Sequence, residues 1–448
     1  MMFKRKIHDE LIKWKSSPLS KNKALIIKGL RQIGKTYSAM HYAKELYENV
    51  VYINFKEDEG IKSVFDGDLK VDRMIMDISA RMPNVRFIPN KTVIVFDEIQ
   101  ECVNARASIK PFMIDGRFDI VCTGSLLGIK GYNKKHGKGV PTGFEHTVYM
   151  KSMDFEEFLW AKGISEDVID EIRSCFDDVK AVSQPIHTAM IRYFREYICV
   201  GGLPHIVDTF LKTSDMNAVR SELLDIIEEY KDDFGKHLDE NENEYTDPVL
   251  LGRINRAFDS IPSQLSKDNK KFQYSILSKK GRGSEYQAAI QWLVDAGLVV
   301  QCFNLSLLQL PLEGNKKDDV FKLYLRDTGI FVSMLEPGSA GDILSGNLEI
   351  YKGAIYENII ADAFSKMDRN LYYYRRESEL EIDFIMKYKG KIALVEVKSK
   401  NSKTKAANHI LSTPEYGVEL CIKLGECNVG LNNKIMTIPH YMAFLLKE

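Results

Sequence analysis

The chain has 448 residues, 44% hydrophobic and 28% charged, which is typical of a folded globular protein of about two to four domains. Its formal net charge is −1, so no overall field attracts nucleic acid or an anionic membrane, and such contacts would need local patches. The seven cysteines show no C-x-x-C spacing, which indicates neither a disulfide framework nor a zinc site. No apolar run is long enough to span a bilayer, so we expect a cytoplasmic protein without a membrane partner.

The first strong signal is a glycine-rich motif between a strand and a helix. An apolar run at 24–27 precedes the segment GLRQIGKT at 29–36, and helical periodicity begins directly after it. This is the pattern G-x-x-x-x-G-K-T, a P-loop, in which backbone N–H groups cradle phosphate oxygens. We expect Lys35 to reach the β- and γ-phosphates of ATP and Thr36 to ligate Mg²⁺. The residues expected to contact the nucleotide are Gly29, Arg31, Gln32, Ile33, Gly34, Lys35, Thr36 and Tyr37.

The segments that follow alternate between strands and helices. Strand-like runs at 50–55, 92–98 and 118–125 are continuously apolar, and helical segments separate them. Such strands are typical of a parallel sheet covered on both faces. We therefore expect residues 1–152 to form an α/β P-loop ATPase core.

Two carboxylates end the strand at 92–98, which we expect to lie beside the P-loop strand. Asp97 is suited to hold Mg²⁺, and Glu98 to orient and deprotonate an attacking water. The alternative is that both residues cap the next helix, but the P-loop favours catalysis. Thr123 ends the next strand, where it could contact the water or the γ-phosphate, or serve as a turn residue beside Gly124.

Phosphoryl transfer also requires a positive charge beside the phosphates, usually from an arginine. Arg31, Arg106 and Arg117 are the candidates, and the sequence does not choose between them. Glu98 argues against a small-molecule kinase, because transfer to an acceptor other than water needs no water-activating glutamate.

The middle of the chain changes to a helical pattern over 153–263. From 264 to 336, two helices and a hairpin follow one another, which predicts a winged-helix module. The stretch 264–282 has six Lys or Arg against one Asp, a net +5. This stretch could meet the phosphates of DNA, although winged helices also act as packing elements between domains.

The C-terminal residues 337–448 read as a separate domain with carboxylates at regular places. A helix carries Glu357, and two strands joined at Lys389-Gly390 carry Asp383 and Glu396. A two-residue hairpin loop here would set Asp383 directly opposite Glu396. Like charges repel at that distance, so the pair calls for a cation.

This pattern suits a Mg²⁺-dependent phosphodiesterase. It consists of a glutamate on a helix, an aspartate on one strand and a Glu-x-Lys motif on the next strand. Glu357, Asp383 and Glu396 would hold the metal, and Lys398, on the same face as Glu396, would activate the attacking water. The alternative is an ordinary surface, with Lys398 paired to Glu381 and Glu357 complementing its helix N-terminus.

Segments along nearly the whole chain resemble a family of prokaryotic AAA-type ATPases with a C-terminal domain of the PD-(D/E)xK nuclease fold. The matching segments are GLRQIGKT (29–36), VFDEIQE (95–101), CTGSLLG (122–128), MDFEEFL (153–159), GGLP (201–204), LYLRDTGI (323–330), GAIYEN (353–358), EIDFI (381–385) and VEVKS (395–399). The resemblance implies an ASCE-type P-loop core, a helical and winged-helix middle, and a restriction-endonuclease-like α/β end. Gly143-Phe144 departs from the family pattern, which often has a Gly-Lys or Gly-Arg there.

Two functions follow from this sequence. The first is a Mg²⁺-dependent ATPase whose hydrolysis controls a nuclease-like domain that acts on or binds DNA. The second is an ATP-dependent switch or scaffold that works through protein partners, since nuclease-like domains of this kind are not always active. A ring of several copies of the chain would require an arginine supplied in trans.

Overall fold

The computed structural model describes residues 3–126, 141–234, 248–277, 282–347, 351–376, 380–399 and 404–447. The chain divides into two compact units. The N-terminal unit contains Lys4–Lys151, and the C-terminal unit takes in the described residues from Ser152 onwards.

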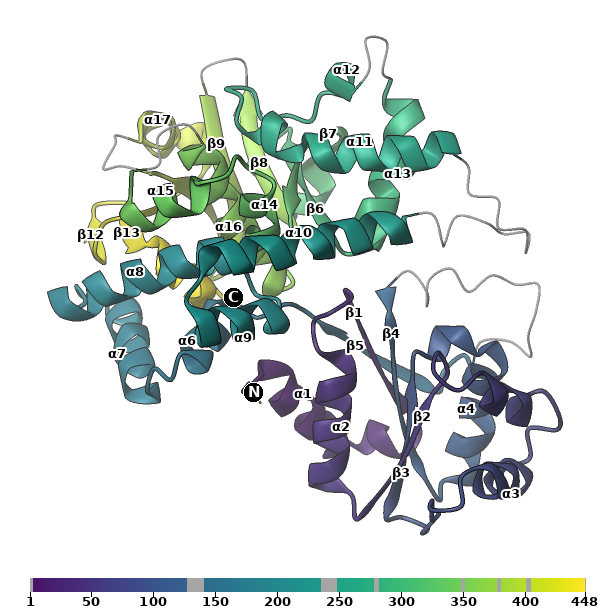
Figure 1. The fold of residues 1–448 in the computed structure, drawn as a ribbon. Helices are drawn as coiled ribbons and strands as arrows, with labels where there is room; N and C mark the ends of the chain where they lie inside the picture. Colours follow the sequence, from purple (N-terminus) through teal and green to yellow (C-terminus); the bar gives the residue numbers. More distant parts are fainter. Residues whose placement is uncertain are drawn as a thin grey trace. The chain divides into compact units, whose positions relative to one another are not determined.

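The N-terminal unit is a parallel sheet with helices on both faces. Its helices and strands are α1 (Lys6–Lys15), β1 (Ala24–Gly29), α2 (Lys35–Leu46), β2 (Asn49–Asn54), α3 (Val71–Arg81), β3 (Thr92–Asp97), α4 (Val103–Asp115), β4 (Asp119–Ser125) and β5 (Glu145–Met150). The strand order is β2-β3-β4-β1-β5, and every neighbouring pair is parallel. Helices α1 and α2 cover one face, and α3 and α4 cover the other (Figure 1). The predicted α/β class and parallel sheet are confirmed.

Three phenylalanine rings anchor the core on the α3 and α4 face of this sheet. Phe55, Phe65 and Phe96 have ring centroids 5.4–5.6 Å apart and are fully buried. Strand β3 is buried along its whole length, as a strand covered on both faces should be.

Two features of this sheet differ from the sequence prediction. We expected the strand that ends at Asp97 to lie beside the P-loop strand, but β4 lies between them. The sequence also gave no prediction for β5, whose side chains alternate between exposed Tyr149 and buried Val148 and Met150. That alternation is typical of an edge strand with one face in solvent.

The C-terminal unit combines a helical layer with a mixed sheet. Its helices are α6 (Phe155–Ala161), α7 (Glu166–Asp177), α8 (Gln184–Val200), α9 (Pro204–Thr213), α10 (Met216–Asp233), α11 (Pro248–Leu265), α12 (Tyr274–Leu277), α13 (Gly283–Asp295), α14 (Thr328–Ser333), α15 (Ser339–Ser345), α16 (Lys352–Lys366) and α17 (Lys405–Ser412). Its strands are β6 (Val299–Leu305), β7 (Lys316–Leu325), β8 (Leu371–Arg376), β9 (Leu380–Tyr388), β10 (Lys391–Val397), β11 (Leu420–Gly425), β12 (Gly430–Asn432) and β13 (Ile435–Pro439). The strand order is β12-β13-β11-β10-β9-β8-β6-β7, and α16 packs against β6, β7, β8 and β10.

The hairpin β6–β7 belongs to this sheet, because β6 pairs in parallel with β8. We expected a winged-helix module at 264–336 and a separate domain at 337–448, with a linker at 337–346. The pairing of Cys302 with Leu371 instead carries one sheet across that boundary, and α15 occupies most of the expected linker. Strand β6 is largely buried, which suits an interior strand better than a solvated wing.

Three of the sequence motifs meet at one buried joint of the C-terminal unit. The Met153 N–H donates to the Gly202 carbonyl oxygen at 2.7 Å, and the Gly202 N–H donates to Asp327 Oδ2 at 2.8 Å. Asp327 Oδ1 accepts from the N–H groups of Gly329 and Ile330, at 3.0 and 3.3 Å, and so caps α14. The motifs MDFEEFL, GGLP and LYLRDTGI therefore have a structural role.

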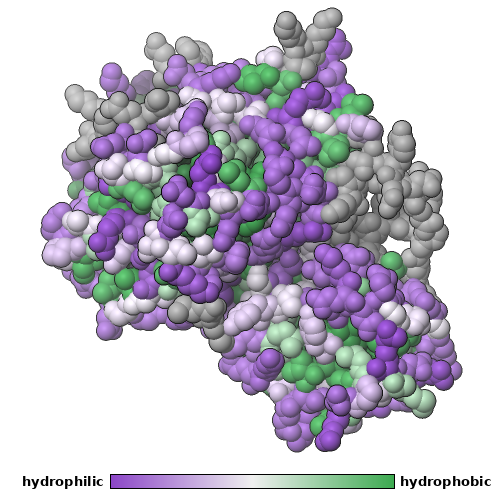
Figure 2. Space-filling view, viewed as in Figure 1, coloured by the Kyte–Doolittle hydropathy of each residue, from purple (hydrophilic) through white to green (hydrophobic). Residues whose placement is uncertain are grey.

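No helix in the described part of the chain is long and apolar enough to cross a membrane. On the face shown in Figure 2, hydrophilic residues predominate and hydrophobic ones lie in small groups among them.

Replacing Gly202 with alanine should destabilise the C-terminal unit, because the added Cβ would lie 2.1 Å from the Met153 carbonyl oxygen. Overpacking of this kind costs about 1–3 kcal/mol. The measurement is urea unfolding followed by tryptophan fluorescence in a Trp14→Phe background, where only Trp160 and Trp292 of the C-terminal unit report.

Gly341→Ala is the matched control for this variant. A Cβ at Gly341 meets no atom within 4 Å, and alanine is the better helix former in α15 by about 0.8–1 kcal/mol. Equal losses of stability in the two variants would contradict the close packing of Gly202 against Met153.

Candidate functional site

The P-loop lies between β1 and α2 and is shaped by left-handed backbone. Gln32 has φ +63° and Gly34 has φ +86°, and α2 begins at the next residue, Lys35. The Lys35 ammonium donates to the Leu30 carbonyl oxygen at 2.9 Å, across the loop. Burial lowers the pKa of Lys35, and the nearby charges of Glu98 and Asp97 oppose that change.

The other residues predicted to contact the nucleotide occupy different environments. Gly29 ends β1, and the side chain of Ile33 is fully buried, so that only its backbone is available to a ligand. Tyr37 is 52% exposed on the first turn of α2. Arg31 is close enough to Lys35 for its charge to act on the Lys35 pKa.

Asp97 is the centre of this site, and its carboxylate is buried among neutral donors. Its Oδ1 accepts from the Thr36 hydroxyl at 2.8 Å and also contacts the Thr123 hydroxyl. Its Oδ2 accepts from the Tyr52 hydroxyl at 2.7 Å and from the Asn54 amide at 3.3 Å. The two residues expected to hold Mg²⁺, Thr36 and Asp97, are therefore in direct contact.

Tyr52 and Asn54 were missed by the sequence analysis. Both lie at the end of β2, and Asn54 is the register partner of Asp97 on β3. Polar residues at the end of β2 could have predicted a contact with Asp97, but only if the strand order had been known. Burial and the hydrogen bond to Asp97 raise the pKa of Tyr52 well above its usual value.

Glu98 follows Asp97 with a left-handed backbone, at φ +53°. Its N–H donates to the Thr123 hydroxyl at 3.3 Å, and its carboxylate contacts the side-chain amide of Gln100. Neither Asp97 nor Glu98 caps α4, whose N-cap is Cys102, and Glu98 makes no capping bond to the short 3₁₀ turn that follows it. The side chains of Asp97 and Glu98 therefore do not serve as helix caps in this structure.

Two of the three candidate arginines are paired with carboxylates inside the N-terminal unit. Arg106 is buried and binds Glu145 with two hydrogen bonds, at 2.7 and 2.8 Å. Arg117 pairs with Asp115 at 2.7 Å and with Asp72 at 2.5 Å. Arg31 is the candidate that lies within the P-loop itself.

In the C-terminal unit, the predicted hairpin and its register are confirmed. Tyr388 pairs with Lys391, and the ladder continues to the pairing of Phe384 with Val395, one residue before Asp383 and Glu396. Asp383 Oδ2 accepts from the Val397 N–H at 2.8 Å, so its carboxyl replaces a ladder partner at the end of β10.

Lysines from separate elements contact these carboxylates. The Glu357 carboxylate contacts Lys270 Nζ, lies 3.6 Å from Lys322 Nζ, and accepts from the Tyr324 hydroxyl at 3.0 Å. Lys398 contacts the buried Glu396. We refer to the set Lys270, Lys322, Glu357, Asp383, Glu396 and Lys398 as the carboxylate–lysine cluster.

Lys398 and Glu381, considered above as an alternative surface ion pair, each pair with other residues. Glu381 pairs with Lys322 at 2.7 Å and with Arg375 at 3.3 Å, while Lys398 contacts Glu396. Lys270 and Lys322 were not singled out from the sequence, because they lie 87 and 35 residues from Glu357 and only the fold joins them.

Two acids of the cluster, Glu357 and Asp383, have opposite pKa shifts. Burial, together with the charges of Glu357 and Glu396, raises the pKa of Asp383 to about 7. Burial would also raise the pKa of Glu357, but Lys270 and Lys322 outweigh it and bring that pKa to about 2. The surroundings of Glu357 therefore favour its ionised form, whereas those of Asp383 favour its protonated form.

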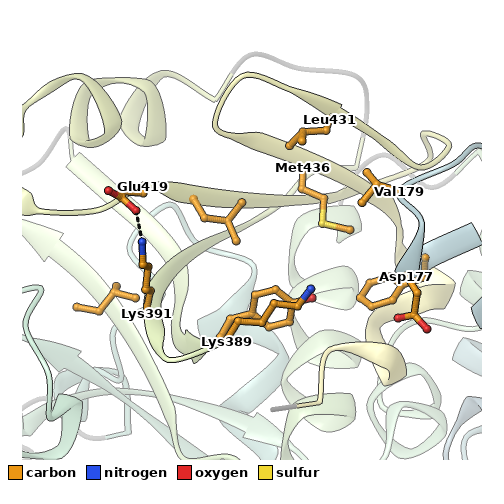
Figure 3. Close-up of a pocket in the computed structure, with 11 residues that line it drawn as sticks. Asp177, Val179, Lys389, Lys391, Glu419, Leu431 and Met436 are labelled. Atoms are coloured by element: carbon orange, nitrogen blue, oxygen red, sulfur yellow. Dashed lines mark hydrogen bonds and ion pairs between the residues drawn. The ribbon is translucent and has the colours of Figure 1, made fainter.

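A pocket of about 330 Å³ lies elsewhere in the C-terminal unit (Figure 3). Leu431, Met436 and Val179 line it on one side, and Lys391 forms a 2.6 Å ion pair with Glu419 at the other. The residues of the carboxylate–lysine cluster are not among those that line this pocket.

Comparison with known families identifies the N-terminal unit. Residues 21–159 match the model of an AAA domain, which with the P-loop and parallel sheet makes this unit an AAA-type P-loop ATPase domain. Residues 191–340 and 352–441 match two models described as domains of unknown function, DUF8612 and DUF4143. The predicted PD-(D/E)xK nuclease fold finds no support in these matches and stays a prediction. No curated protein matches the chain.

Several solved structures show a weak similarity to this chain. The Walker-type ATPase PABY2304 of Pyrococcus abyssi is 14% identical, with a TM-score of 0.41, over 74% of this chain and 96% of that one. The RuvB Holliday junction branch migration motor of Thermotoga maritima is 14% identical, with a TM-score of 0.30, over 67% and 90%. AMPPCP-bound DnaA from Aquifex aeolicus is 9% identical, with a TM-score of 0.29, over 64% and 87%. Likenesses this weak carry no inference about function.

Replacing Tyr52 with phenylalanine should lower the affinity for Mg²⁺, so that ATP turnover requires a higher Mg²⁺ concentration. The reason is that the change removes the hydroxyl that orients Asp97. Loss of such an outer partner costs roughly 10–100-fold in metal affinity or activity. The measurement is ATP turnover as a function of Mg²⁺ concentration. Tyr149→Phe is the control, since Tyr149 is 55% exposed on β5 of the same unit, and equal effects in both variants would contradict the role of Tyr52.

Proposed function

We propose that the N-terminal unit hydrolyses ATP in a Mg²⁺-dependent reaction. The observation that carries this proposal is the 2.8 Å contact of the Thr36 hydroxyl with Asp97, beside Lys35 and Glu98. One hydroxyl and one carboxylate are oxygen donors of the kind that Mg²⁺ takes, so the residues fit the ion. When bound, Mg²⁺ neutralises charge on the β- and γ-phosphates.

The residues of the chain have distinct roles in this reaction. Lys35 binds the phosphates, and releasing its ammonium from the Leu30 carbonyl exchanges a neutral partner for an anionic one. Glu98 orients the attacking water and takes its proton. Thr123 contacts the Asp97 carboxylate and accepts from the Glu98 N–H, and so holds the Glu98 backbone beside Asp97.

We further propose that the carboxylate–lysine cluster is a phosphodiester site that acts on DNA under control of the ATPase. Glu357, Asp383 and Glu396 would hold a divalent cation, and Lys398 would stabilise or activate the attacking water. Support comes from the convergence of these residues on two paired strands and one packed helix. Lys270 belongs to the basic stretch 264–282, which could meet the DNA backbone.

The second candidate function is an ATP-dependent switch with an inert cluster that works through protein partners. The observation that favours it is the charge balance of the cluster. Glu357 contacts Lys270 and lies 3.6 Å from Lys322. Lys322 also pairs with Glu381 at 2.7 Å, and Lys398 contacts Glu396. Buried carboxylates neutralised in this way need no metal ion.

Lys35→Ala should abolish ATP turnover, and Glu98→Gln should retain ATP binding while turnover falls roughly 10²–10⁴-fold, because the general base is lost. Binding is measured with a fluorescent ATP analogue and turnover by phosphate release. Lys44→Ala, at an exposed position of the same helix, is the control. Normal turnover in Glu98→Gln would contradict its role as the base.

Lys270→Gln separates the two functions of the cluster. If the cluster is a metal site, the variant should bind Mn²⁺ about 10–100-fold more tightly, because a charged hydrogen bond of about 1.5–3 kcal/mol no longer competes for Glu357. Asp383→Asn should then abolish both Mn²⁺ binding and DNA cleavage. The measurements are Mn²⁺ titration by electron paramagnetic resonance and cleavage of plasmid DNA.

Lys271→Gln is the control for this test, since it changes the neighbouring residue in the same way. If neither the wild type nor Lys270→Gln binds Mn²⁺ or cuts DNA, the cluster is inert, which favours the protein-partner function.

A further inference from the structure

A second group of metal-ligating side chains lies in the N-terminal unit, on the two helices that cover one face of its sheet. His8 belongs to α1, and His41 and Glu45 are four residues apart on α2. Their ligand atoms all lie within 4.8 Å of one another, and within the described residues they form the one such group of three His, Cys, Asp or Glu side chains.

The distances within this group suit a small ion with nitrogen and oxygen ligands. Glu45 Oε2 lies 2.7 Å from His8 Nε2 and 3.7 Å from His41 Nε2. Metal–ligand bonds of about 2.0–2.1 Å in a tetrahedral site place neighbouring ligand atoms about 3.3 Å apart. The two separations from Glu45 fall on either side of that value, and all ligand atoms of the group lie within 4.8 Å of one another, so side-chain adjustments of up to about 1.5 Å would meet it.

The two imidazole rings are already arranged side by side. They stack with centroids 4.6 Å apart and an angle of 29° between their planes, and both direct Nε2 to the same carboxylate oxygen. An ion shared by the two rings would lie in the plane of each ring, so metal binding would turn the rings out of this stack about their side-chain torsions while both nitrogens stay near Glu45 Oε2. His41 and Glu45 share one helix face, and four residues of separation is the spacing that lets two helical side chains converge.

We propose that His8, His41 and Glu45 bind one transition-metal ion of the zinc type. Two imidazoles and one carboxylate are the ligands that Zn²⁺, Co²⁺ and related ions favour over Mg²⁺ or Ca²⁺. The side chains are 20%, 35% and 45% exposed, so water can reach the group and complete the coordination. This site is separate from the Mg²⁺ position proposed at Thr36 and Asp97.

The ion would join α1 to the helix that begins in the P-loop. Arg5, which precedes α1, donates to the Ile33 carbonyl oxygen of that loop at 3.1 Å and to the Lys151 carbonyl oxygen at 2.6 Å. A metal bridge between α1 and α2 would therefore brace the segment that already contacts the P-loop. The site thus has a structural role in the ATPase domain.

The test is a Co²⁺ titration of the untagged full chain after treatment with a chelator. Tetrahedral Co²⁺ absorbs visible light and Zn²⁺ does not, so the expected result is one absorbing Co²⁺ per chain that a stoichiometric amount of Zn²⁺ displaces. His8→Ala and His41→Ala should each weaken binding by more than the roughly 10–100-fold that follows loss of an outer-sphere partner. A scan of thermal unfolding should show that Zn²⁺ raises the melting temperature of the wild type and of neither variant.

His41→Ala is the decisive variant because it leaves the bond between His8 and Glu45 in place. His205→Ala is the matched control, since it removes an exposed histidine that faces a single carboxylate, Glu222, at 3.3 Å. A Co²⁺ spectrum and stoichiometry unchanged in His41→Ala, or the absence of tetrahedral Co²⁺ in the wild type, would overturn the proposal and leave a hydrogen-bonded histidine pair.

Discussion

The cost of burying a carboxylate without partners governs both candidate sites of this protein. Asp97 is 2% exposed at the end of β3, and four side-chain donors from three different segments meet its two oxygens. An unpaired charge at that depth would be strongly destabilising, so the ends of neighbouring strands must supply the donors. The strand order β2-β3-β4-β1 does so, because parallel strands end at one edge of the sheet.

The kind of partner decides what each carboxylate remains able to do. The hydrogen-bond donors to Asp97 are hydroxyl and amide groups, which satisfy its oxygens but do not cancel its charge. Glu357, by contrast, is held by lysines, which cancel its charge within the protein. The carboxylate of Glu357 is therefore balanced by positive charges of the protein, whereas the oxygens of Asp97 are satisfied by neutral donors.

The sequence predicted the features that depend on the spacing of neighbouring residues, and it missed the contacts that depend on strand order and packing. The P-loop, the hairpin at Lys389-Gly390 and its register are set by neighbouring residues, so the pattern was sufficient. Tyr52, Lys270 and Lys322 reach their partners only through the packing of distant elements. The same reason hid His8, which lies 33 residues before His41 and joins it only because α1 packs on α2.

The position of Lys270 is fixed by the fold and is not a chance attraction between surface charges. The segment around it is held by three hydrogen bonds: from the Phe272 N–H to the Phe321 carbonyl, from the Gln273 N–H to the Gln264 side chain, and from Arg375 to the Asn269 side chain. Lys270 therefore reaches Glu357 from a segment that is itself bonded to α11, β7 and β8. A divalent cation at this cluster would have to compete with an ammonium group that the chain holds in place, and that competition determines whether the cluster is a catalytic site or a structural one.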